Sequence, residues 1–116
     1  MHVHCIEERT HLQRTLRSPL GFYRRLWSVV DEIQPDVIHD HGAWLPSNVA
    51  AAWVARRSGT PLVATPRGMV TDWSLSHQAG KKKAAWHLYQ THVFRQAALF
   101  HATAPAEVEN LRALGL

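Results

Sequence analysis

The nine residues DVIHDHGAW, at positions 36–44, decide which fold this chain is expected to adopt. The stretch begins with two β-branched apolar residues, Val37 and Ile38, as a buried strand does. It then turns polar and continues with two histidines, a carboxylate and a glycine. The sequence therefore predicts a strand over 36–40 whose carboxyl end carries polar side chains.

Strand and helix patterns alternate along the chain on both sides of this stretch. Short apolar runs predict strands over 2–6, 36–40, 61–65 and 99–103. Helical periods predict helices over 17–36, 46–59, 81–98 and 105–115, with a loop over 67–80. Such alternation is typical of an α/β fold with an open, Rossmann-like parallel sheet and helices on both faces. Right-handed crossovers place the carboxyl ends of all strands at one edge, where ligands of open parallel sheets bind.

Local signals support the predicted helices. Ser18 is expected to cap the first helix, and Pro35 to end it. Either Ser47 or Asn48 is expected to cap the second, and Gly59 to follow its last turn. The predicted inward residues are Leu20, Tyr23, Leu26, Trp27, Val30 and Ile33 in the first helix and Trp86, Tyr89, Val93 and Ala97 in the third.

Length and composition limit the function classes. A chain of 116 residues with 46% hydrophobic residues is expected to form one domain with a real core. Its single cysteine, Cys5, cannot form an internal disulfide, and no apolar run suits a signal peptide or a membrane span, so a cytoplasmic location is expected. The net charge of +4 favours an anionic partner. The basic residues are scattered rather than striped, which argues against nucleic acid.

The candidate site residues follow the predicted strands. His39 and His41 are two apart and should point to one face. They could form a metal pair, or one could pack while the other faces the cleft; no third ligand has the spacing of a known motif, so no metal is expected. Gly42 fits a turn. Arg67, between a proline and a glycine, is either a surface arginine or a side chain that binds a phosphate or carboxylate.

The loop and the helix that follow Arg67 add weaker candidates. Asp72 and Trp73 either cap and pack on the next segment or line a sugar site. Lys81, Lys82 and Lys83 are either a solvated face or contacts for an anionic acceptor or membrane, because positive charge is unfavourable near a helix start unless an anion offsets it. The chain has no G-x-G-x-x-G, P-loop or G-x-S-x-G motif.

Three stretches, in this order, resemble the N-terminal domain of family 4 glycosyltransferases of the GT-B fold. They are PDVIHDHGAWLPSNVAAAWVARRSGTPLVATPRGM at 35–69, KKKAAWHLYQ at 81–90 and FHATAPAEVENLRALGL at 100–116. The likeness begins at about residue 17 and is closest to bacterial members that build cell-surface polysaccharides.

The resemblance implies an acceptor-binding domain that faces a donor-binding domain. In this family the second domain binds the nucleotide sugar, and transfer usually retains the anomeric configuration without a bound metal. This chain matches only part of the first domain, so the donor-binding domain is expected in cis or as a separate chain, and the chain alone is expected to be inactive. The implied acceptor is a saccharide or a lipid-linked saccharide at the inner face of the membrane.

The resemblance also implies roles for single residues. Asp40 and His41 map to the cleft edge near the transferring sugar and are the catalytic candidates. Many relatives carry a histidine in place of Arg67. The acceptor-binding candidates are His39, Gly42, Trp44, Arg67, Gly68, Asp72 and Trp73. The alternative is a non-catalytic module that binds an anionic sugar or lipid head group in the same cleft.

Overall fold

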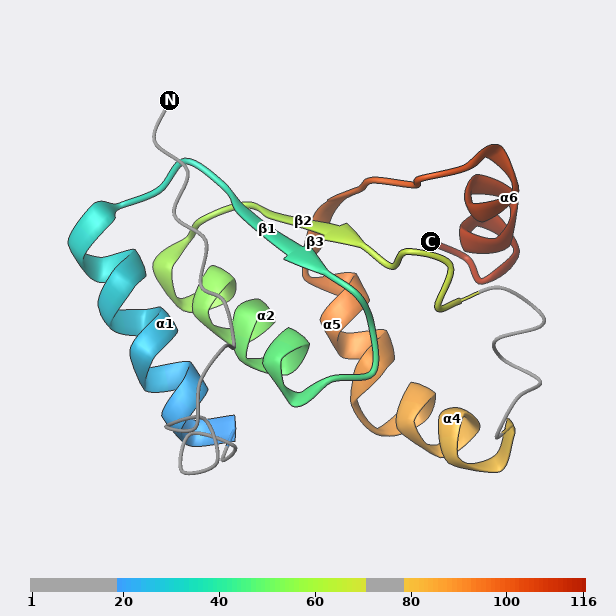
Figure 1. Cartoon of the computed structure of the whole chain (residues 1–116), viewed down its shortest axis with the longest axis horizontal. Coiled ribbons are helices and arrows are strands. Elements are labelled where there is room, and N and C mark those ends of the chain that lie inside the picture. The colour runs from blue at the N-terminus through green and yellow to red at the C-terminus, as the bar shows by residue number, and fades with distance from the viewer. Residues whose placement is uncertain (1–18, 71–78) are drawn as a thin grey trace.

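The structure, a computed structural model, describes residues 19–70 and 79–116. Helices and strands alternate along these residues (Figure 1). The helices are α1 (Pro19–Ile33), α2 (Pro46–Ser58), α4 (Ala79–Ala85), the π-helix η2 (Trp86–Gln90), α5 (Thr91–Arg95) and α6 (Pro105–Ala113). The strands are β1 (Ile38–His41), β2 (Leu62–Thr65) and β3 (Ala97–Phe100). The predicted strand over 2–6 and most of the predicted loop lie outside the described residues.

The three strands form one parallel sheet in the order β1-β2-β3. Ile38 pairs with Leu62 and His41 with Thr65, so β1 and β2 end together. Between β2 and β3 the register shifts by one residue after Leu62. This arrangement confirms the predicted α/β class with an open, Rossmann-like parallel sheet.

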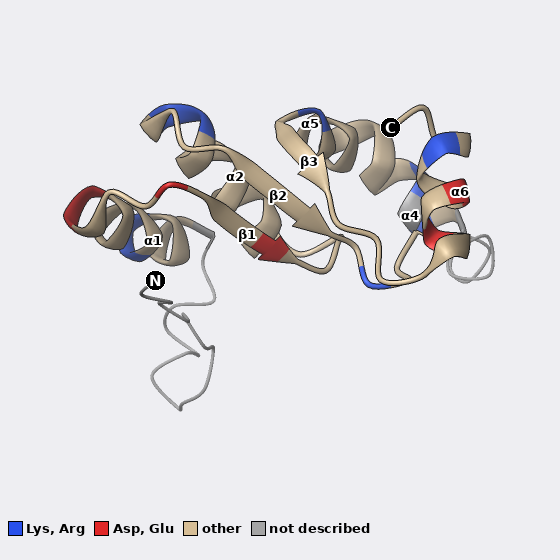
Figure 2. Ribbon diagram, turned by 90° about the horizontal axis from the view of Figure 1, so that it is seen from above, with Lys and Arg blue, Asp and Glu red and all other residues tan. Residues whose placement is uncertain are grey.

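The core lies between the sheet and a helical layer formed by α2 and α5. The alanines of α2 allow close approach, and the larger core side chains come from neighbouring elements, such as Val30 of α1 and Phe94 of α5. Phe94 contacts Phe100 of β3 edge to face, with 5.4 Å between ring centroids. Burial of one such aromatic side chain stabilises the fold by about 1.5–3 kcal/mol. In Figure 2 the opposite face of the sheet is seen with none of the described helices in front of it.

The first two helices differ from the prediction in detail. The structure ends α1 at Ile33, two residues before Pro35, and Ser18 lies outside the described residues. The N-cap of α2 is Leu45, not Ser47 or Asn48. Asn48 stands three residues further on, and its Oδ1 accepts a hydrogen bond from the backbone N–H of Leu45 at 2.9 Å. Gly59 follows α2 in the left-handed conformation, with φ of 73°, as expected.

The third helix is shorter at its end than predicted. It ends at Arg95, and β3 already begins at Ala97, so the boundaries predicted at 98 and 99 are wrong. The predicted helix includes Ala97 and Ala98 because alanine has the highest helix propensity. Pairing of this segment with β2 outweighs that local preference. Ala97 therefore packs from a strand and not from the helix.

Candidate functional site

Three histidines gather at the carboxyl ends of the strands, on the face of the sheet opposite α2 and α5. His39 and His41 of β1 share one face, as their spacing predicts, and their ring centroids are 4.2 Å apart. His101, directly after β3, lies with its ring centroid 5.8 Å from that of His39. We call His39, His41, His101 and Arg67 the edge cluster.

A buried hydroxyl links two of these rings. Thr65, at the end of β2, is 1% exposed. Its Oγ1 lies 2.6 Å from Nε2 of His39 and 3.3 Å from Nδ1 of His101. The sequence did not single out His101, because the last strand was predicted to run to residue 103, nor Thr65, because its two partners lie 26 and 36 residues away along the chain.

Arg67 contacts the remaining ring of the edge cluster, that of His41. Its backbone has a positive φ of 52°, and its Nε donates a hydrogen bond to Nδ1 of His41 at 3.2 Å. Burial lowers the pKa of His41 from its ordinary 6.5, and electrostatic interactions with His39, Arg67 and His101 lower it further. His41 is therefore a neutral imidazole near pH 7, with Nδ1 as the acceptor and Nε2 carrying the proton.

Asp40, the other catalytic candidate, lies on the opposite face of β1. Nδ2 of Asn48 donates to both carboxylate oxygens of Asp40, at 3.0 and 2.9 Å. Burial raises the pKa of Asp40 from 3.8 to about 6, although hydrogen bonds from Asn48 and from the backbone of His41 favour the charged form. The structure thus brings His39, His41 and Arg67 together, while Asp40 faces the start of α2.

The loop after β1 is held from two sides. Gly42 has a φ of +93°, as expected of a turn glycine, and its N–H donates to the carbonyl of Thr65 at 2.8 Å. The backbone N–H of Trp44 donates to Oε1 of Gln90 at 2.8 Å, and the hydroxyl of Tyr89 donates to the carbonyl of Trp44 at 2.8 Å. The π-helix η2 therefore fixes the backbone of Trp44, whose own φ is 69°.

A buried carboxylate fixes the loop that carries Arg67. Glu107 of α6 is 2% exposed. Its Oε1 accepts from the N–H of Gly68 at 2.6 Å, and its Oε2 accepts from the N–H and Oγ1 of Thr103 at 2.7 and 3.0 Å. Burial by itself would raise the pKa of Glu107, but these donors hold it below its ordinary value. Sequence reasoning missed Glu107, for which only its place in the first turn of α6 gave a signal.

The remaining candidates lie apart from the edge cluster. Asp72 and Trp73 are outside the described residues. Lys81 and Lys83 are exposed on α4, and the structure describes no side chain for Lys82. Within 19–70 and 79–116, no group of three or more His, Cys, Asp or Glu side chains is arranged to hold a metal ion.

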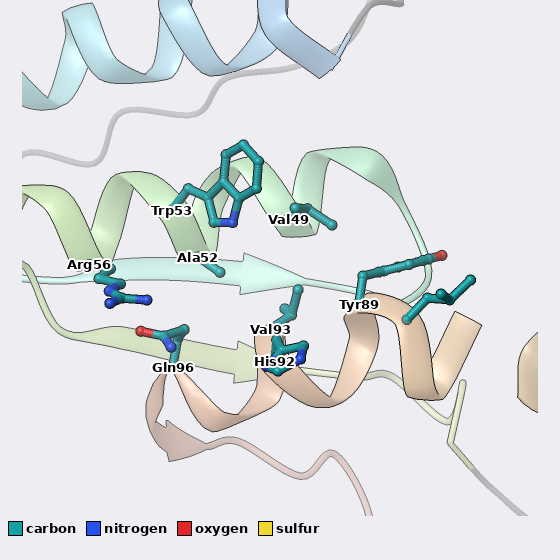
Figure 3. Close-up of a pocket in the computed structure, with 9 residues that line it drawn as sticks. Val49, Ala52, Trp53, Arg56, Tyr89, His92, Val93 and Gln96 are labelled. Carbon is teal, nitrogen blue, oxygen red and sulfur yellow. The ribbon is translucent and has the colours of Figure 1, made fainter. Parts of the chain in front are cut away.

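A groove of about 250 Å³ lies in the helical layer and not at the sheet edge (Figure 3). It runs between α2 and the segment formed by η2 and α5, and Trp53 beside it is 64% exposed. The lining residues are Val49, Ala52, Trp53, Arg56, Leu88, Tyr89, His92, Val93 and Gln96. It is the competing location for a ligand on this chain.

The part of the chain that the structure describes contains no helix long and apolar enough to cross a membrane.

One solved structure that is similar to this chain is a protein from Listeria monocytogenes described as a UDP-N-acetylglucosamine 2-epimerase, with a TM-score of 0.59 and 18% identity. The match covers 98% of this chain but 28% of that protein, and at this identity it supports the fold alone. No curated protein matches the chain. The model of the glycosyl transferase 4-like domain matches residues 2–116, and the chain belongs to this family.

Proposed function

We propose that this chain is the acceptor-binding part of a retaining glycosyltransferase. The complete enzyme would transfer a sugar from a nucleotide sugar to a saccharide or lipid-linked acceptor in cell-surface polysaccharide synthesis. The chain spans 28% of the length of the similar Listeria monocytogenes protein, and a separate donor-binding domain is part of this proposal.

The edge cluster is the observation that supports the proposal. Arg67 and three imidazoles lie at the carboxyl ends of parallel strands, the edge where ligands of such sheets bind. A guanidinium among imidazoles favours a phosphate or carboxylate, as in a nucleotide sugar or a phosphorylated acceptor. Two features fix the backbone beside Arg67: the Glu107 contact to Gly68 and the left-handed φ of Arg67 itself.

The residues of the cluster have separate proposed roles. In glycosyl transfer the leaving diphosphate gains negative charge, and fixed donors aimed at it lower the barrier. Arg67 supplies a permanent positive charge, and His41 supplies an Nε2–H donor because Arg67 occupies its Nδ1. Asp40 acts at a distance, by holding Asn48 and hence the loop after β1.

The proposal is tested in the protein in which this chain is joined with a donor-binding domain. Arg67→Ala removes the guanidinium charge from the edge cluster. The loss of transition-state stabilisation should be about 1.5–3 kcal/mol, which lowers kcat/KM for sugar transfer roughly 10- to 150-fold. Arg95→Ala, which removes an exposed arginine of α5, is the matched control and should leave transfer unchanged. The 116-residue chain alone should transfer no sugar.

Two results would count against this function. Unchanged transfer in folded Arg67→Ala protein would remove the edge cluster from the reaction. Anion binding without transfer, even with a donor-binding domain present, would favour the non-catalytic module for an anionic sugar or lipid head group.

A further inference from the structure

The hydroxyl of Thr65 lies between two imidazoles and can give its proton to only one of them. Its Oγ1 is 2.6 Å from Nε2 of His39 and 3.3 Å from Nδ1 of His101. Because Thr65 is 1% exposed, that proton needs a protein acceptor. Among the described residues, these two ring nitrogens are the partners of the hydroxyl.

The single hydroxyl proton of Thr65 couples the tautomers of the two rings. If Thr65 donates to His101, it accepts from Nε2–H of His39, and both neutral rings carry their proton on Nε2. If Thr65 donates to His39, both rings carry it on Nδ1. In either case the two rings hold the same tautomer. Their other nitrogens then differ, because one is a donor and the other an acceptor.

We propose that His39, Thr65 and His101 form a subsite for a hydroxyl group of a neutral saccharide. This inference rests on the proposed function and extends it to a site that takes no charge. A sugar hydroxyl both donates and accepts, so it satisfies a donor and an acceptor that lie side by side. Both rings are exposed at the end of the sheet, where a ligand can reach them.

The neighbouring groups favour a hydroxyl over an anion at this position. A carboxylate or a fully ionised phosphate group only accepts, so it would face the lone pair of one imidazole. The guanidinium of Arg67 and Nε2–H of His41 are donors, and these two residues are joined by the hydrogen bond from Nε of Arg67 to Nδ1 of His41 rather than through Thr65. The edge cluster is thereby divided into an anion side at Arg67 and His41 and a hydroxyl side at His39 and His101. Thr65 is a positioning residue that acts through the two rings.

The test uses the 116-residue chain with ¹⁵N-labelled histidine, observed by long-range ¹H–¹⁵N NMR at a pH where the rings are neutral. The wild-type chain should show one tautomer for both His39 and His101. Thr65→Val keeps the shape of the side chain but removes the hydroxyl, so the resonances of both contacting nitrogens should move together. Thr65→Ser should restore them. Thr60→Val, two residues before β2 begins, is the control and should change neither ring.

Methyl glucoside, methyl galactoside and methyl mannoside are then titrated, with inorganic phosphate as the anionic probe. At least one glycoside should shift the two rings, and Thr65→Val should weaken that binding about tenfold, the loss expected for one or two hydrogen bonds. Phosphate binding should survive Thr65→Val and be lost in Arg67→Ala.

Opposite tautomers in the wild-type chain, or unchanged glycoside binding in folded Thr65→Val, would overturn the subsite. Glycoside binding without phosphate binding would support the subsite and count against the proposed role of Arg67. Phosphate binding without any glycoside response would leave that role intact and remove the subsite.

Discussion

Asp40→Asn should raise the free energy of unfolding of this chain at neutral pH relative to its value in acid. The Asp40 carboxyl has a pKa of about 6 in the folded chain, because burial disfavours its charge, against an ordinary 3.8. Below pH 3.8 the group is protonated in both the folded and the unfolded state. Above pH 6 it is ionised in both, and the folded state carries the full cost of a buried charge. Asp40 therefore lowers the free energy of unfolding as pH rises between these limits.

The size of the effect follows from the two pKa values. A carboxyl pKa of about 6 against 3.8 corresponds to about 3 kcal/mol of stability. His41 acts in the opposite direction: its lowered pKa makes the folded chain lose stability as pH falls below 6.5. The pH profile of the wild type alone therefore mixes both groups. The difference between Asp40→Asn and wild type isolates Asp40.

Urea unfolding at pH 4, 5, 6 and 7, followed by tryptophan fluorescence, measures this difference. New contacts between the introduced amide and Asn48 add a constant offset that does not change with pH. Between pH 4 and 7 the variant should gain about 2.4 kcal/mol relative to wild type, because part of the full effect is already present at pH 4. Asp31→Asn, at an exposed position of α1, is the control and should show no such gain. A flat difference within about 0.5 kcal/mol would refute the desolvation of the Asp40 carboxylate.

Three further changes test other parts of the structure. Glu107→Gln should destabilise the fold by about 1.5–3 kcal/mol, since an amide cannot accept from both Gly68 and Thr103; the loss should appear above the ordinary pKa of 4.5 and vanish in stronger acid, as urea unfolding can show. Gly42→Ala should lower the free energy of thermal unfolding by about 1–2 kcal/mol, because alanine is strained at a φ of +93°. An added Cβ would meet the sulfur of Met69 at an ordinary 3.7 Å, so the loss would come from the backbone, and no loss would contradict the left-handed turn. Changing all three lysines at 81–83 to glutamine should weaken binding of the complete enzyme to anionic liposomes by less than about 1 kcal/mol per lysine, only at low salt; a salt-independent loss would exclude a screened surface contact.

The elements that could be predicted from sequence are those whose pattern is strong within one segment. The stretch 36–44 predicted a strand with a polar carboxyl end, which the structure places at Ile38–His41, and alternation with helices predicted the parallel sheet. Gly59 was correctly expected past α2 because few residues other than glycine adopt that conformation. The end of the third helix was predicted wrongly, since the pairing of Ala97 with Leu62 is a contact between distant segments.

The candidate site was predictable only where its residues are neighbours in sequence. The shared face of His39 and His41 followed from strand geometry, and Arg67 followed from its place after the next strand. Thr65 and Glu107 act through partners 26 to 39 residues away, which no local pattern shows. The separation of Asp40 from His41 by strand alternation was available in the sequence, but the family resemblance grouped the two residues as one catalytic pair.

Amide chemical-shift mapping on the ¹⁵N-labelled chain, with the sugar phosphate glucose 1-phosphate as the probe, tests whether the edge cluster binds an anionic sugar. The largest shifts should lie at the carboxyl edge of the sheet, at His39, His41, Gly42 and Gly68, and should be lost in Arg67→Ala. Shifts centred on the groove of α2 and α5, at Val49, Trp53 and Leu88, would contradict binding at the edge cluster.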